Sequence, residues 1–131
     1  MKQRAERNDS VETWAEKMKR LYAHIPILPL DELRKLPECD DYDAGVYFLW
    51  LKDELQYIGK STQICYRLQL QDQGNRYGGI KRIPFDRHTC IVVESDRIQS
   101  DRIGDKLKPL ERAYIAHYQP PFNFIGQNPG T

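Results

Sequence analysis

The strongest constraint on the fold is a pair of apolar and aromatic segments separated by only three polar residues. The first segment, residues 44–51, reads AGVYFLWL, and the second, residues 55–59, reads LQYIG. β-Branched and aromatic residues of this kind are typical of strands. The segments are joined by the polar sequence Lys52-Asp53-Glu54. A connection this short implies an antiparallel hairpin.

A third strand and a helix are predicted after the hairpin. Residues 88–95 (HTCIVVES) are again typical of a strand. After the second strand, Ser61 or Thr62 can cap a helix that runs to about residue 72. Residues 73–87 are rich in glycine and basic side chains and are predicted to form a loop.

The last predicted helix covers residues 107–118. Pro109 suits its first turn, where a backbone N–H has no helical partner in any case, and Pro120 and Pro121 end it. Together these elements predict an α/β (α+β) fold, in which a small three-stranded antiparallel sheet is flanked by helices.

The N-terminal part of the chain has a different pattern. Residues 10–23 carry apolar side chains near helical period and are predicted to form an amphipathic helix. Asp31 can cap a short second helix over residues 32–36. A chain of 131 residues is long enough for one full domain and not for two. We therefore expect a helical extension over residues 1–40, followed by one domain over residues 41–131.

Composition argues against several classes of protein. The three cysteines, Cys39, Cys65 and Cys90, form no CxxC pair, which argues against a zinc site. With no signal peptide in view, their odd number indicates a reducing interior. No apolar run approaches the length that spans a membrane. We expect a soluble cytoplasmic protein without an organic cofactor, in which Cys65 and Cys90 are small core residues.

Charge is unevenly distributed along the chain, although the net charge is only +1. Residues 31–56 carry eight acidic and three basic side chains, whereas residues 60–88 carry six basic and two acidic ones. A local basic stretch can contact phosphates. A solvated surface explains the same distribution, so charge alone does not identify a partner.

Two tyrosines of the hairpin are candidates for chemistry. Tyr47 lies in the middle of the first strand and Tyr57 lies near the end of the second. Adjacent antiparallel strands can bring both phenols onto one face, with Val46 on the other. A cross-strand aromatic pair that only packs explains the same pattern.

Three further polar residues lie beside apolar positions or turns. Arg67 is next to Leu68 in the predicted helix, where an arginine either extends along apolar surface or binds an anion. Glu111 borders the apolar stripe of the last helix, where a carboxylate either pairs with a base or holds a hard cation such as Mg²⁺. Asn123 follows two prolines, and a turn is its simplest role.

Five elements occur along residues 43–124 in an informative order. Gly45-Val46-Tyr47 is followed ten residues later by Tyr57-Ile58-Gly59. Lys60-Ser61 directly follows the second of these elements. The other three elements are Arg67, Glu111 within LERAYI, and the segment QPPFN that ends at Asn123. Together these motifs resemble those of the GIY-YIG nuclease family, with Val46 in place of isoleucine.

The resemblance implies a small metal-dependent DNA endonuclease built on a three-stranded antiparallel sheet. In such a site Glu111 would hold one Mg²⁺ or Mn²⁺ ion, and Arg67 would neutralise charge that builds up in the transition state. Tyr47 would take a proton from the attacking water, which requires nearby positive charge because a free phenol has a pKa of about 10. Tyr57 would orient the water, and Asn123 would brace the site.

One departure from the family pattern affects the activation of Tyr47. Some family members carry a histidine one turn after the arginine, whereas this chain has Gln71 there. His88 cannot be assumed to replace that histidine. Lys60 then becomes the side chain that would stabilise a phenolate, together with Arg67 and the metal.

The resemblance implies DNA as the partner. Basic and aromatic residues in and near the predicted loop can contact a DNA backbone or its bases, although a solvated loop explains them equally well. These residues are Lys60, Arg76, Tyr77, Lys81, Arg82 and Arg87. One active site cuts one strand, so cleavage of both strands would require a homodimer or two visits.

An alternative function is a non-catalytic DNA-binding or assembly module that retains the nuclease fold. The complete set of five site residues favours the enzyme, because a binding module needs none of them. Residues 10–23 can pack on the domain, dimerise or touch DNA, and packing is the simplest of the three. The preferred DNA sequence or structure, and a role in repair rather than restriction, do not follow from the sequence.

Overall fold

Three long antiparallel strands form the centre of the protein, in a computed structural model that describes residues 28–35 and 42–124. They are β2 (Asp43–Leu51), β3 (Glu54–Ser61) and β4 (Arg87–Ser95). A two-residue strand, β1 (Leu28–Pro29), pairs with β4, so the strand order is β1-β4-β2-β3. The predicted three-stranded antiparallel sheet is confirmed, and β1 extends it at one edge.

The connection between β2 and β3 is the predicted hairpin. Lys52 and Asp53 both have positive φ, at 50° and 70°. This combination matches a type I′ turn, whose twist fits that of the flanking strands. Asp53 also pairs with Arg87 at 2.7 Å, which ties the turn to the start of β4.

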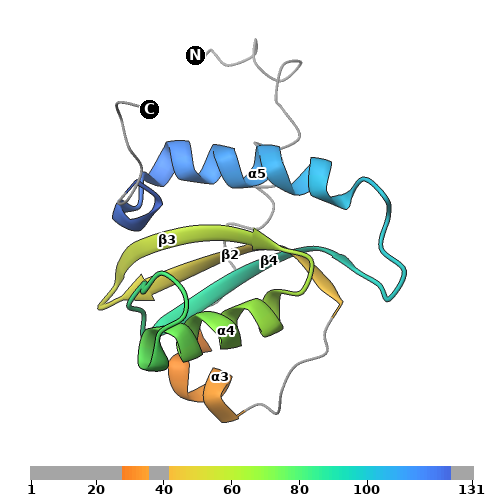
Figure 1. The fold of residues 1–131 in the computed structure, drawn as a ribbon. Helices are drawn as coiled ribbons and strands as arrows, with labels where there is room; N and C mark the ends of the chain where they lie inside the picture. The colour runs from red at the N-terminus through yellow and green to blue at the C-terminus, as the bar shows by residue number, and fades with distance from the viewer. Residues whose placement is uncertain (1–27, 36–41, 125–131) are drawn as a thin grey trace, which may run out of the picture.

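Helices cover both faces of the sheet (Figure 1). Because side chains alternate along β2, Val46 and Phe48 pack with one helix layer, whereas Tyr47 and Leu49 pack with the other. Helix α5 lies on the first face, and α3 and α4 lie on the second. The bounds are α3 (Leu30–Lys35), α4 (Ile64–Tyr77), α5 (Ile103–Tyr118) and a 3₁₀ turn, η2 (Pro121–Asn123).

Two predicted helix caps are wrong. Neither Ser61 nor Thr62 caps α4, because the N-cap residue is Gln63. Ser61 belongs to β3, and its hydroxyl accepts a hydrogen bond from the Gln63 backbone N–H at 2.9 Å. Helix α3 begins at Leu30, so Asp31 lies inside its first turn, where a carboxylate interacts favourably with the helix dipole.

Helix α4 also extends beyond its predicted end near residue 72. It continues to Tyr77, and Gly78 ends it with a φ of 91°, a conformation that favours glycine. Asp72, at the predicted end of the helix, is only 4% exposed. Its carboxylate accepts two hydrogen bonds from Arg34, at 2.9 and 3.1 Å, and pairs with Arg76 at 3.0 Å. Two guanidinium groups thus compensate the buried charge.

Helix α5 begins earlier than predicted. It starts at Ile103 rather than at residue 107, so Pro109 lies inside the helix and not in its first turn. A proline at this position removes one helical hydrogen bond. Burial of Ile103 and Leu107 against Ala44 offsets that loss.

The structure tests only some of the predictions for the N-terminal segment, for membrane spans and for the cysteines. The helix predicted over residues 10–23 lies outside the described residues, and the boundary at residue 40 stays a prediction. No helix in the described part of the chain is long and apolar enough to cross a membrane. Cys65 and Cys90 both pack against the core cluster that contains Tyr47, as expected, but Cys65 is disulfide-bonded.

His88, on β4, is a buried histidine. It is 4% exposed, and neither ring nitrogen has a hydrogen-bond partner within the described ranges. Burial lowers the pKa of this imidazole to about 4, because the charged form loses its hydration. In the unfolded chain the ordinary pKa is about 6.5, so the unfolded chain binds the proton first. The stability contributed by neutral His88 is therefore complete above pH 6.5 and is lost as pH falls toward 4.

The substitution His88→Leu is expected to make folding less sensitive to acid. At pH 5, proton uptake by the unfolded chain costs the wild type on the order of 2 kcal/mol. The wild-type melting temperature should therefore fall more between pH 8 and pH 5 than that of the variant, as followed by circular dichroism. The exposed His117 supplies a control, since His117→Leu should keep the wild-type difference. An equal fall in wild type and His88→Leu would contradict the prediction.

Candidate active site

The candidate site begins where Tyr47 of β2 faces Gly59 of β3. The two residues are paired in register. A Cβ atom added to Gly59 would lie 2.4 Å from both Cζ and Oη of Tyr47. The phenol ring therefore lies across the bare backbone of Gly59, on the edge strand of the sheet.

Tyr57 lies on the same face as Tyr47. Its position two residues before Gly59 places it on the same side of β3. The two ring centroids are 6.2 Å apart, with the planes tilted by 44°. Tyr57 is only half-buried, whereas Tyr47 is 1% exposed. The two phenols therefore differ mainly in their access to solvent.

Arg67 reaches this pair from α4. Ile64 and Leu68 of the same helix are buried under the sheet, which fixes the helix face beside them. The Nε–H of Arg67 donates a hydrogen bond to Tyr47 Oη at 3.4 Å. This bond raises the pKa of Arg67. The guanidinium is therefore held charged and against the phenol.

Burial dominates the protonation of Tyr47. It raises the pKa of the phenol to about 12, because an isolated phenolate would lose its hydration. The Arg67 hydrogen bond acts in the opposite direction, while the negative charge of Glu111 raises the pKa further. Burial and Glu111 also raise the pKa of Tyr57. Both phenols are thus protonated at neutral pH in the protein alone.

Glu111 belongs to α5, on the opposite face of the sheet from Arg67. Its carboxylate nevertheless lies within electrostatic range of Tyr47 and Tyr57. Burial raises the pKa of Glu111, while Lys60 of β3 and Arg112 of α5 lower it. Because β3 is the edge strand, groups from the two helix layers can meet around it. The structure thus brings the two phenols and the guanidinium together, and the charge of the Glu111 carboxylate acts on both phenols.

Asn123 closes the edge strand next to this site. Its side-chain amide accepts a hydrogen bond from the Ile58 N–H at 2.9 Å and donates one to the Ile58 C=O at 2.8 Å. These backbone groups point away from β2, where an edge strand has no strand partner. Asn123 thus supplies the missing pairing at the residue between Tyr57 and Gly59.

The turn η2, which carries Asn123, also contacts the α4 face of the sheet. Phe122 packs against the cluster that contains Tyr47 and Tyr57. Lys81 Nζ donates a hydrogen bond to the Phe122 carbonyl at 3.0 Å. After α5 the chain therefore passes around the edge of β3. There Asn123 binds the β3 backbone, and Phe122 contacts the α4 face of the sheet.

The segment expected as a flexible basic loop is anchored to α4. The Gln71 amide donates to the Lys81 carbonyl at 2.8 Å. The Asn75 amide makes two hydrogen bonds with the Ile83 backbone, at 2.7 and 2.8 Å. Ile83 and Phe85 are buried. Gln71 and Asn75 thus hold the loop in place.

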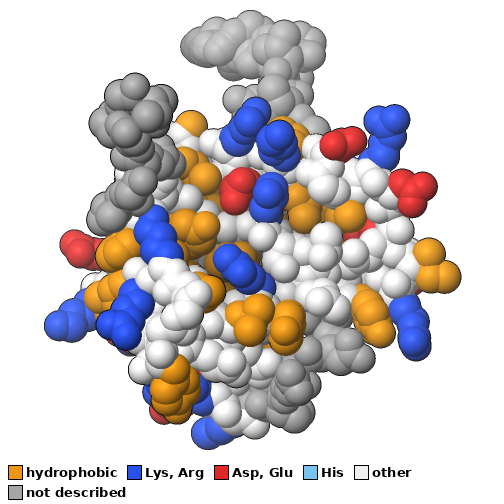
Figure 2. Space-filling view, in the orientation of Figure 1, with side chains coloured by type: hydrophobic (Ala, Val, Ile, Leu, Met, Phe, Trp, Pro, Cys, Tyr) orange, Lys and Arg blue, Asp and Glu red, His pale blue; other side chains and the backbone are white. Residues whose placement is uncertain are grey.

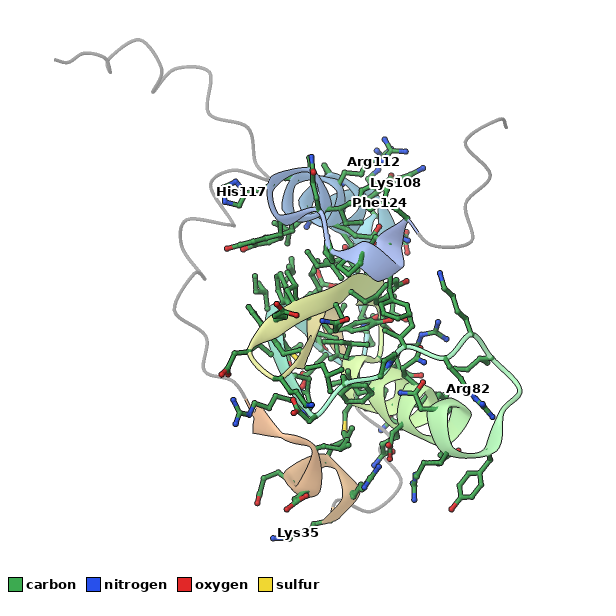
Figure 3. All side chains as sticks on the ribbon, turned by 90° about the vertical axis from the view of Figure 1, so that its left-hand side faces the viewer. Lys35, Arg82, Lys108, Arg112, His117 and Phe124 are labelled. Atoms are coloured by element: carbon green, nitrogen blue, oxygen red, sulfur yellow. The ribbon has the colours of Figure 1, made fainter. Side chains whose placement is uncertain are left out.

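The predicted DNA contacts separate into two groups. Arg76 and Tyr77 lie on α4, where Arg76 is paired with Asp72 and stacks over the Tyr77 ring at 5.1 Å. Arg87 is paired with Asp53 at the hairpin turn. Lys81 lies in the loop and donates its hydrogen bond to the Phe122 carbonyl. By contrast, the exposed Lys60 and Arg82 take part in none of the ion pairs formed among the described residues; Arg82 is labelled in Figure 3.

The site offers one carboxylate to a metal ion. Within residues 28–35 and 42–124, no group of three or more His, Cys, Asp or Glu side chains is placed to hold one. Mg²⁺ is commonly bound by one or two carboxylates, with substrate phosphate and water filling its shell. The donor set around Glu111 therefore suits Mg²⁺ or Mn²⁺ bound together with a phosphate, and does not suit a closed structural metal site.

Comparison with known proteins finds similarity among solved structures. No protein-family model matches the chain, and no curated protein matches it. The chain is similar to the GIY-YIG N-terminal endonuclease domain of UvrC from Thermotoga maritima, which is bound to its catalytic divalent cation, magnesium. The two share 26% sequence identity over 71% of this chain and 97% of that one, with a TM-score of 0.48.

The substitution Gly59→Ala tests the packing of Tyr47. The new Cβ would overlap the phenol ring, so the ring or the strand must shift, at a cost of about 1–3 kcal/mol. We expect a lower midpoint of chemical unfolding and a changed tyrosine environment in near-ultraviolet circular dichroism. Gly104→Ala on α5 is the matched control, because a Cβ there meets no atom within 4 Å. Wild-type stability in Gly59→Ala would disprove the packing described for Tyr47.

Proposed function

We propose that this protein is a divalent-metal-dependent DNA endonuclease that hydrolyses phosphodiester bonds. The observation that carries the proposal is the approach of a guanidinium and a carboxylate to two phenols around one sheet edge. Arg67 is hydrogen-bonded to Tyr47, and the charge of Glu111 reaches Tyr47 and Tyr57. The resemblance of the surrounding motifs to those of GIY-YIG nucleases supports the choice of reaction.

Arg67 would bind the phosphate that is attacked. Its charge is permanent, and its Nε–H already points at the site through the bond to Tyr47. Phosphodiester hydrolysis builds negative charge on the phosphate oxygens, which a positioned guanidinium stabilises most in the transition state. The other N–H groups of the Arg67 guanidinium would donate hydrogen bonds to the phosphate oxygens.

Tyr47 would act as the general base that accepts a proton from water. Because burial raises its pKa to about 12, the phenolate must be stabilised when substrate and cation are present. Arg67 contributes through its hydrogen bond, and Lys60 adds positive charge near Glu111. Tyr57, which is more exposed, would orient the water.

Glu111 would hold the metal ion. The carboxylate of Glu111 is half-buried, and the positive charges of Lys60 and Arg112 partly compensate its negative charge in the absence of a metal ion. When bound, Mg²⁺ or Mn²⁺ would polarise the phosphate and stabilise the leaving oxygen. Asn123 would keep β3, and with it Tyr57, in place through its pairing with Ile58.

Two conservative substitutions test the catalytic roles. Glu111→Gln and Tyr47→Phe should each lower Mg²⁺-dependent nicking of a plasmid by roughly 10²- to 10⁴-fold, the range for loss of a charge-stabilising or proton-accepting group. Both should retain a wild-type circular dichroism spectrum. Glu54→Gln is the matched control, because Glu54 is exposed at the hairpin end of β3. Full activity in either variant would refute the assigned role, and metal-independent binding without any cleavage would favour the non-catalytic module.

The pH dependence of cleavage tests Tyr47 as the base. A protonated phenol cannot accept a proton from water, so log kcat/KM should rise with pH with a slope of about 1. With a pKa near 12 before cation and substrate bind, the rise should extend above pH 8. The residual activity of Tyr47→Phe should lack this dependence. A wild-type plateau already reached at pH 6 would rule out Tyr47 as the base.

A further inference from the structure

Two basic residues of α5 lie beside the candidate metal ligand and were not among the predicted DNA contacts. Lys108, Glu111 and Arg112 are spaced i, i+3 and i+4, so they share one side of the helix. The buried stripe of α5 runs alongside through Leu107 and Leu110. Lys108 and Arg112 are exposed. Arg112 is close enough to Glu111 to lower its pKa.

Neither basic residue forms an ion pair among the described residues. The nearby Asp105 instead pairs with Arg102 at 4.0 Å. Like charges four residues apart on a helix are slightly destabilising. Arg34, Arg76 and Arg87 differ, because they pair with Asp72 or Asp53 at 2.7–3.0 Å. Two cations beside the single carboxylate of Glu111 therefore leave net positive charge on this side of α5.

The figures place this charge on one face of the molecule. Figure 3 shows Lys108, Arg112 and Arg82 on the same side of the molecule, whereas Lys35 and His117 lie on the opposite side. That side is the one that faces the reader in Figures 1 and 2. Figure 2 shows Lys and Arg side chains over α5 and others between α5 and α4.

We propose that Lys108 and Arg112 form a phosphate-binding strip that holds the DNA backbone on the α5 side of Glu111. Side chains four residues apart on a helix start about 5–6 Å from each other, so each can reach one of two neighbouring phosphates of a strand. Contacts of this kind position a substrate without reading its sequence. Arg82 would contact the backbone on the other side of the site. The inference rests on the proposed function, since it takes DNA as the substrate.

The strip can be tested by binding alone. Fluorescence anisotropy of a labelled duplex, measured in EDTA over a range of salt concentrations, reports phosphate contacts without cleavage. Each lost contact should reduce the slope of log K against log salt by about 0.9. At 0.1 M salt this corresponds to roughly eightfold weaker binding for each contact. Lys108→Ala and Arg112→Ala should each show this change, and the double variant should show both.

The matched control is Lys35→Ala, which removes one positive charge on the opposite side of the molecule. It should leave the salt slope unchanged, and Arg112→Lys should restore most of the binding lost in Arg112→Ala. An unchanged slope in the double variant, with a wild-type melting curve, would overturn the strip even if the wild type cleaves DNA. Failure of the wild type to bind any duplex would overturn the strip and the proposed function together. Cleavage failure with strip-dependent binding would overturn only the nuclease.

Discussion

The contact between Tyr47 and Gly59 is the constraint on which the rest of the site depends. A side chain at position 59 would occupy the volume that the phenol fills. Without that volume, Tyr47 could not lie across the edge strand and meet Arg67 of α4. Glycine in a strand interior normally weakens it, because it has no side chain to pack. Here the ring of Tyr47 from β2 packs over Gly59, so a residue of β2 compensates for the side chain that β3 lacks.

The same edge of the sheet explains how residues distant in the sequence meet. An interior strand would separate the layer of α4 from the layer of α5, whereas β3 has a free side. Glu111 comes to it from one face and Arg67 from the other. Asn123 uses the free backbone groups of Ile58 to fasten the chain there. An exposed strand edge invites association with other chains, and a side-chain amide that pairs with it reduces that risk.

Local patterns in the sequence were sufficient for the strands and for the face that each tyrosine occupies. Alternation places Val46 and Tyr47 on opposite faces without reference to the rest of the chain. The helix ends were less predictable, because burial decides them. Pro109 lies inside a helix whose earlier start is fixed by contacts of Ile103, and Asp72 is helical because two arginines neutralise it.

The candidate site shows the same division between local and distant information. Order and spacing bring Tyr47, Tyr57, Arg67 and Glu111 to attention, but not the reason that Gly59 is required. Nor does a linear pattern show that Asn75 fixes the backbone of Ile83 and so anchors a loop rich in glycine. Such pairings depend on a residue's partners in space. By contrast, the spacing of the basic residues Lys108 and Arg112 around Glu111 can be read from the sequence once the helix is known.

The buried carboxylate of Asp72 has a consequence for how the protein opens. Arg34 of α3 donates two of the hydrogen bonds that keep this charge satisfied, and Leu33 of the same helix is buried in the cluster that contains Tyr47. Detaching α3 would therefore leave a desolvated anion with half of its compensation and would expose apolar surface at the same time. Local fluctuations of α3 are coupled to those of α4, so the two helices belong to one cooperative unit of unfolding.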